Sequence, residues 1–209
     1  MTRATSTALL VIDVQNDFIP GGPLAVPEGD QIVPLINRLG RSFNQVILAQ
    51  DWHPAGHASF ASSHPGKQPF DTAELPYGEQ TLWPDHCIQG SPGAALYPTL
   101  DLPHAQLIIR KGCNPDIDSY SAFMEADRQT PTGLASYLKE RGIDTVYVVG
   151  LALDFCVMFT ALDARIAGFN AVVVLDACRG IDIEGSIDAA LRRMQQAGVQ
   201  LIQSTDMTN

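Results

Sequence analysis

The chain has 209 residues, of which 45% are hydrophobic, and this composition suits one globular domain over residues 1–209. Its 13 Lys and Arg against 23 Asp and Glu give a net charge of −10, which argues against nucleic acid or anionic membranes as partners because both need a basic surface. No apolar stretch approaches the roughly 20 residues that cross a bilayer. The N-terminal apolar segment runs into Asp13 and lacks a signal-peptide pattern, so we expect a cytoplasmic protein.

Short apolar runs alternate with helical patterns along the chain. Strands are predicted, in chain order, at residues 8–14, 45–51, 105–111, 145–150, 171–177 and 199–204. Helices are predicted at 31–43 with Asp30 as N-cap, and at 132–142, 156–167 and 185–198, each of these three closed by a glycine. Strands rich in Val, Ile and Leu, separated by helices, predict an α/β fold: a doubly wound parallel sheet with helices on both faces.

Residues 51–104 break this alternation. The segment is rich in Pro, Gly, His and Trp and has no clear periodicity. A connection of this length inside a compact domain is usually functional. We therefore expect it to contribute to binding.

Reactive side chains fall at the carboxyl ends of the predicted strands. Asp13, Asp51 and Lys111 end the first three strands, and the fourth leads through Gly150 to Cys156. Ligands of doubly wound sheets bind at this edge. The pattern predicts that two acids, a lysine and a thiol meet at one site.

Cys156 is a candidate nucleophile. The free N–H groups and the dipole of a helix N-terminus favour an anion, so a thiol placed there tends toward thiolate. Asp13 can accept its proton, and Lys111 can hold Asp13 in place. The alternative is a structural ion pair between Asp13 and Lys111 beside an inert buried thiol.

The 51–104 segment offers ligands for a metal ion. Asp51 and His53 are two apart on an extended strand end and so point the same way. With His86 from the loop they form a carboxylate and two imidazoles, which leaves positions open for water or substrate. His57 is a rival ligand, and Ser59 can contribute an oxygen.

Four other loop side chains have a structural role or a choice of roles. His64 and His104 are expected to be satisfied by hydrogen bonds. Phe18 and Trp83 lie in loops beside the polar groups. Trp83 can anchor the loop, and it can also stack on a flat ring.

Five segments together resemble one known family. They are "ALLVIDVQNDF", "DWHPAGHASF", "WPDHCIQG", "RKGCNPDIDSYSAF" and "GLALDFCVMFTALDA". In order and spacing, over nearly the whole length, they are similar to the isochorismatase-like cysteine hydrolases and, among these, to the nicotinamidases (pyrazinamidases). The chain departs from some relatives at Ser59, where they carry a further metal ligand, and at Leu153, where they often carry Thr.

The resemblance implies a six-stranded parallel sheet and hydrolysis of nicotinamide to nicotinate and ammonia through a cysteine thioester, with a role in NAD salvage. It implies a catalytic triad of Asp13, Lys111 and Cys156. It also implies one divalent metal ion, zinc in the first place and iron or manganese otherwise, held by Asp51, His53 and His86. The remaining implied residues are the oxyanion hole, formed by the N–H groups of Ala152 and Cys156 with a cis bond before Ala152, and the substrate contacts Phe18, Trp83, Tyr120 and Leu151.

The sequence alone leaves other functions possible. The protein can be a hydrolase of another small amide or of isochorismate, although those lines commonly lack the paired histidines or the cysteine. It can be a zinc hydrolase whose metal activates water while Cys156 is structural, or an inert binding domain of the same fold. The sequence leaves the identity of the metal, the breadth among aromatic amides and the presence of a homo-oligomer undecided.

Overall fold

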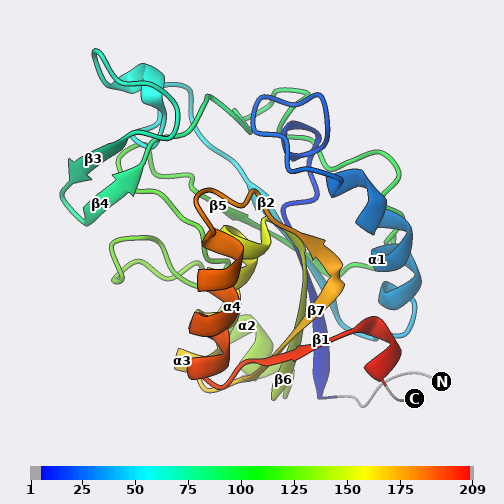
Figure 1. The fold of residues 1–209 in the computed structure, drawn as a ribbon. Helices are drawn as coiled ribbons and strands as arrows, with labels where there is room; N and C mark the ends of the chain where they lie inside the picture. Colours follow the sequence, from blue (N-terminus) through cyan, green and yellow to red (C-terminus); the bar gives the residue numbers. More distant parts are fainter. Residues whose placement is uncertain (1–5, 208–209) are drawn as a thin grey trace.

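Six parallel strands form the central sheet of the computed structural model, which describes residues 6–207 (Figure 1). In the order in which they lie side by side, they are β5 (Leu107–Lys111), β2 (Val46–Asp51), β1 (Thr7–Ile12), β6 (Thr145–Leu151), β7 (Asn170–Arg179) and β8 (Gln200–Ile202). All five neighbouring pairs are parallel. The predicted fold class is confirmed.

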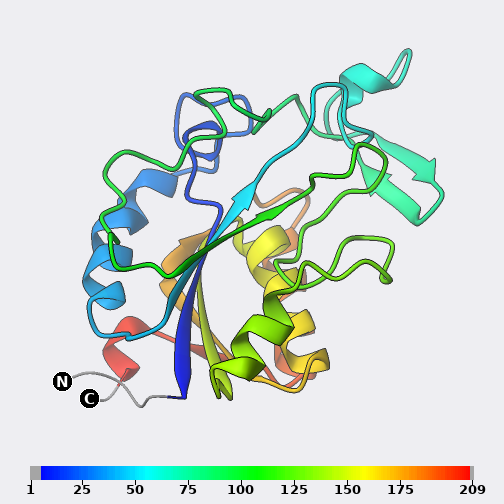
Figure 2. The ribbon, with the colours of Figure 1, turned by 180° about the vertical axis from the view of Figure 1, so that it is seen from behind.

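Helices cover both faces of this sheet, as Figures 1 and 2 show from opposite sides. The helix α1 (Val33–Gly40) packs on one face, and α2 (Leu134–Glu140), α3 (Met158–Ile166) and α4 (Ser186–Gln196) pack on the other. Alternate residues of β1 enter the two cores: Leu10 faces the three helices, and Leu9 faces α1. Within residues 6–207, no helix is long and apolar enough to cross a membrane.

The strand order places β1 and β6 at the centre, where the direction of winding reverses. The chain runs from β1 outward through β2 to β5, then returns to β6 and runs outward through β7 to β8. Ile12 and Gly150 are paired across this junction. Gly150 has a φ of 116°, and any Cβ there would collide with the carbonyl oxygen of Ile12, so this close approach requires glycine. Asp13 and the turn that carries Cys156 leave the sheet here, where a doubly wound fold binds its ligand.

The 51–104 segment has more regular structure than the sequence predicts. It holds a 3-10 helix at Ala61–Ser63 and a hairpin of β3 (Thr72–Leu75) and β4 (Gly78–Thr81). The hairpin stands apart from the main sheet in Figure 1. Its strands have four residues each and are largely exposed, so they carry too little hydrophobic alternation to be recognised.

Two predicted helix starts differ from the structure. Asp30 is not an N-cap, because it lies inside a 3-10 helix at Gly29–Ile32, and α1 begins only at Val33 with no side-chain cap. Pro34 in the first turn of α1 has no N–H group that a cap would need to satisfy. Cys156 is not in α3 itself, since a π-helical turn at Leu153–Val157 precedes that helix.

Candidate active site

Lys111 is the centre of a buried cluster of charges. Its Nζ lies 2.8 Å from Oδ2 of Asp13 and 2.5 Å from Oδ1 of Asp51, and all three side chains are buried. It also donates to the carbonyl oxygen of Ser119 at 3.0 Å and lies 3.5 Å from Sγ of Cys156. The structure therefore brings the three predicted triad residues together. It also brings Asp51, the second acid expected at this edge, into direct contact with Lys111.

Asp13 is placed to exchange a proton. Its side chain is fully buried directly after β1, and within the described residues its Oδ1 has no hydrogen-bond partner. Burial raises the pKa of Asp13 to about 6, although Lys111 acts to lower it. The carboxyl can thus be ionised near neutral pH and still take up a proton during a reaction.

Cys156 is a buried thiol, and burial acts against the tendency toward thiolate that its place in the sequence predicts. Burial raises its pKa well above the usual range, Lys111 opposes this rise, and Asp13 and Asp51 add to it. Residue 156 sits in the π-helical turn that precedes α3, and not in the first turn of α3 itself. An acceptor for the thiol proton is near, since a carboxylate oxygen of Asp13 lies within 4.8 Å of Sγ.

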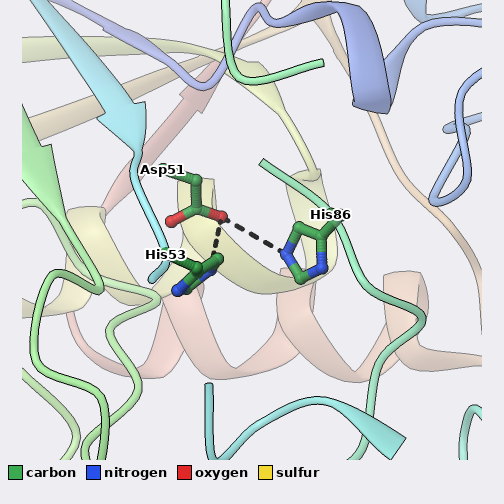
Figure 3. Close-up of side chains that lie close together, drawn as sticks. All are labelled: Asp51, His53 and His86. Carbon is green, nitrogen blue, oxygen red and sulfur yellow. Dashed lines mark ion pairs between the residues drawn. The ribbon is translucent and has the colours of Figure 1, made fainter. Parts of the chain in front are cut away.

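Asp51, His53 and His86 converge on one point, as Figure 3 shows. Oδ2 of Asp51 lies 3.6 Å from Nε2 of His53 and 3.7 Å from Nε2 of His86. The Nδ1 atom of each ring faces a backbone carbonyl oxygen, 3.0 Å away for His53 and 2.8 Å away for His86. These contacts favour the tautomer with hydrogen on Nδ1, which leaves both Nε2 lone pairs directed at the shared point. The donor set therefore fits a divalent ion with open positions.

Gln15 holds Asp51 in this set, and sequence reasoning missed it. Its Oε1 accepts from the N–H of Asp51 at 2.8 Å, and its Nε2 donates to the carbonyl oxygen of Asp51 at 2.8 Å. Gln15 is fully buried. The sequence signal that could have found it is its place two residues after Asp13, within the segment "ALLVIDVQNDF".

The rival ligands are engaged elsewhere. Nδ1 of His57 contacts Oγ of Ser59 at 2.7 Å, so these two side chains satisfy each other. Asp118 lies near them, but its two carboxylate oxygens accept from the N–H of Ser119 and from Gln80, each at 2.8 Å. The remaining histidines contact backbone carbonyl oxygens as expected, at 2.7 Å for His64 and 3.0 Å for His104.

A small cavity connects the thiol with the histidine pair. Among the expected substrate contacts, Phe18, Trp83 and Tyr120 line it, together with Ala152 and Cys156. The other lining residues are Leu24, Asp51, His53, His86, Asp118, Phe155 and Ile181. The structure does not bring Leu151 into this lining, because its side chain is buried in the core on the α1 face of the sheet. The lining combines aromatic and apolar side chains with the thiol, two carboxylates and two imidazoles.

The turn between β6 and α3 has the cis bond that the resemblance implies. The peptide bond between Leu151 and Ala152 is cis. The carbonyl oxygen of Ala152 accepts from the N–H groups of Phe155 and Val157, which closes the turn around Cys156. Ala152 and Cys156 both line the cavity.

Asp154 fixes a neighbouring loop. Its buried carboxylate accepts from the N–H groups of Ile181 and Asp182 at 3.0 and 2.8 Å, and from Oγ of Ser186 at 2.5 Å. Ile181 lines the cavity. Asp154 therefore has a structural role: it ties the turn that carries Cys156 to the start of α4.

Replacing Asp154 by alanine is expected to lower the free energy of unfolding by about 2 kcal/mol, because three donors lose a charged acceptor. Urea unfolding of the variant and the wild type measures this change. Asp188→Ala is the matched control, since Asp188 is an exposed acid in the first turn of α4. Equal losses for the two variants would contradict this role.

Comparisons with known proteins agree with this geometry. The family model described as "Isochorismatase domain" matches residues 7–206. A nicotinamidase from Acinetobacter baylyi is 61% identical over 99% of this chain and 97% of its own length. The solved structure of an Acinetobacter baumanii nicotinamidase and pyrazinamidase has a TM-score of 0.98 at 61% identity, over 99% of this chain and 100% of that one.

A zinc complex is among the similar structures. The pyrazinamidase of Pyrococcus horikoshii in complex with zinc has a TM-score of 0.78 at 37% identity, and the match covers 95% of this chain and 99% of that one. Fold, site geometry and similarity over nearly the full length agree, and the chain belongs to the isochorismatase family.

Proposed function

We propose that this protein is a nicotinamidase that hydrolyses nicotinamide to nicotinate and ammonia, with a role in NAD salvage, and that it also deamidates pyrazinamide. The observation that carries the proposal is the buried cluster of Asp13, Lys111 and Cys156 beside an aromatic cavity and a convergent donor set. The names of the similar proteins from the two Acinetobacter species support the choice of substrate. A cytoplasmic location and a homo-oligomer stay predictions.

The first half of the reaction forms a thioester. Asp13 takes the proton of Cys156 as Sγ attacks the carboxamide carbon, and the raised pKa of Asp13, about 6, suits a group that must accept this proton. The N–H groups of Ala152 and Cys156 would stabilise the oxyanion. Asp13 then gives its proton to the nitrogen, and ammonia leaves.

The second half restores the thiol. Water enters the space that ammonia has left, Asp13 takes a proton from it, and the hydroxide cleaves the thioester to give nicotinate. Asp13 returns the proton to Sγ. Lys111 stays charged throughout, because Asp13 and Asp51 raise its pKa well above the usual range although burial acts to lower it.

Asp51, His53 and His86 would hold one divalent ion, and zinc is the first choice, with iron or manganese as alternatives. When bound, the ion supplies a Lewis acid for the pyridine nitrogen and for its own waters. Phe18 and Trp83 would enclose the ring and exclude water from its faces.

Ammonia release from nicotinamide tests the proposed function. Purified protein loaded with zinc is expected to release one ammonia per nicotinate formed, and iodoacetamide is expected to stop the reaction. The absence of ammonia release with zinc, iron or manganese would refute the proposal. Turnover that survives full alkylation of Cys156 would favour a zinc hydrolase whose metal activates water.

Chelation is expected to remove the preference for nicotinamide over benzamide. A ring nitrogen is a good ligand for a borderline divalent ion, and benzamide has none. Orientation of the amide over the thiol through this contact is expected to contribute about a hundredfold in kcat/KM. Because stacking on Phe18 and Trp83 does not depend on the nitrogen, the residual rates of chelated protein on the two amides should converge.

The measurement is kcat/KM for both amides with and without metal. Circular dichroism first establishes that chelated protein stays folded. If chelation lowers both rates by the same factor and the preference persists, the donor set does not orient the ring.

A further inference from the structure

The hairpin of β3 and β4 has one buried anchor. Of the eight residues in its two strands, only Gln80 is buried, with an exposed fraction of 2%. A buried amide on an otherwise exposed hairpin calls for hydrogen-bond partners, and four polar atoms lie within hydrogen-bond distance of the Gln80 amide. Its contacts lead directly to the wall of the cavity.

Gln80 connects two residues that line the cavity. Its Nε2 lies 2.9 Å from the hydroxyl of Tyr120, 2.8 Å from Oδ2 of Asp118 and 2.7 Å from the carbonyl oxygen of Thr81. Its Oε1 accepts from the hydroxyl of Tyr77 at 3.2 Å. The orientation of this amide is thus fixed at both ends.

The hydroxyl of Tyr120 receives a second donor from Trp83, whose Nε1 lies 3.0 Å away. Gln80 and Trp83 therefore hold the same oxygen from two directions. The rings of Trp83 and Tyr120 meet edge to face, with centroids 6.2 Å apart and an interplanar angle of 90°. Both rings line the cavity that holds Cys156.

Tyr120 stands between two hollows. One is the active-site cavity; the other lies behind Tyr120, where it is bordered by Gln80, Tyr77, Met124 and Phe159. Gln80 does not line the first cavity, so it is not in reach of the substrate. The ring of Tyr120 packs against Phe155 and Phe159 as well as Trp83, and the hydroxyl bonds add a directional restraint to this packing.

We propose that Gln80 is a positioning residue, which holds Tyr120 and through it Trp83 in the orientation that an aromatic amide requires. The proposal rests on the proposed function. Asp118 and Tyr77 keep the amide of Gln80 in place, and Gln80 keeps the aromatic wall in place. The hairpin thereby contributes to substrate affinity without touching the substrate.

Gln80→Met tests this role, because methionine keeps the length of the side chain and removes its donor and acceptor. We expect KM for nicotinamide to rise about tenfold while kcat changes less than about threefold, since the wall binds the ring and does not take part in proton transfer. Glu79→Met is the matched control, because Glu79 is the exposed neighbour on the same strand. Its KM should equal that of the wild type.

Tyr120→Phe removes the hydroxyl and leaves the bond between Gln80 and Asp118 intact. It should raise KM by a similar factor, and Gln80→Met added to it should change KM less than about twofold. A tenfold effect of Gln80→Met in the Tyr120→Phe background would overturn the proposal. A wild-type KM in folded Gln80→Met protein would also overturn it. If Gln80→Met fails to fold, Tyr120→Phe takes its place, because this variant keeps the hairpin anchored to Asp118, and a wild-type KM in Tyr120→Phe would overturn the proposal as well.

Fluorescence separates this proposal from the choice of substrate. The chain has 2 tryptophans, so in a Trp52→Phe background only Trp83 emits. Gln80→Met should shift the emission of Trp83 in the free protein, whereas Glu79→Met should not. This readout stands even if wild-type protein releases no ammonia from nicotinamide, and an unchanged emission would count against the positioning role.

Discussion

Replacing Cys156 by alanine is expected to abolish turnover of nicotinamide while the protein stays folded and binds its metal. Sγ of Cys156 is the only sulfur that lines the cavity among the described residues, and Asp13 and Lys111 both lie next to it. Without a thiol no thioester can form, and a loss of at least about a thousandfold in kcat/KM follows. Ammonia release, metal content and circular dichroism on the same preparation measure the three properties.

Cys113→Ala is the matched control for this prediction. Cys113 is exposed and lies two residues beyond Lys111, outside the cavity, so its loss should leave kcat/KM unchanged. Cys156→Ala protein that keeps its rate within about tenfold, or about 1.4 kcal/mol of barrier, would rule out covalent catalysis through this thiol. Iodoacetamide should inactivate Cys113→Ala as it does the wild type.

The sheet and the meeting of residues at its edge could be predicted from the sequence. Buried parallel strands appear as continuous Val, Ile and Leu runs, and a polar residue that ends such a run must lie at one edge of the sheet. This simple rule suffices to bring Asp13, Asp51 and Lys111 together, because β1, β2 and β5 are neighbours in the observed order. Cys156 required one more fact, that β6 pairs with β1.

Features that depend on the direction of side chains could not be predicted from the sequence. The bridge from Lys111 to Asp51 arises because residue 111 pairs with residue 51 across β5 and β2, and a register cannot be read from either strand alone. Burial decides the pKa of Cys156, and burial is set by loops that are distant in sequence. Leu151 lies next to Ala152, yet it enters the core and not the cavity lining.

Replacing Lys111 by methionine is expected to inactivate the protein and to lower its free energy of unfolding by about 3–5 kcal/mol at neutral pH. Lys111 neutralises two buried carboxylates, Asp13 and Asp51. Without it Asp13 keeps no cation and loses its fixed orientation toward Sγ of Cys156. Urea unfolding and ammonia release on zinc-loaded protein measure the two effects. Lys139→Met, which removes an exposed lysine at the end of α2, is the control and should do neither.

The loss of stability in Lys111→Met should depend on pH in one direction. Burial already raises the pKa of Asp13 to about 6 in the presence of Lys111, which acts to lower it, so removal of Lys111 moves this pKa higher still. A carboxyl with a higher pKa in the folded protein than in the unfolded chain destabilises the fold as it ionises, and the penalty is absent below about pH 4, where both forms are protonated. The difference between variant and wild type should therefore be smaller at about pH 5 than at about pH 8, because Asp13 in the variant then escapes its unpaired charge by taking up a proton. In zinc-loaded protein the ion would neutralise Asp51, so this difference would report on Asp13. A difference that is equal at the two pH values would show that Asp13 does not depend on Lys111 for its charge.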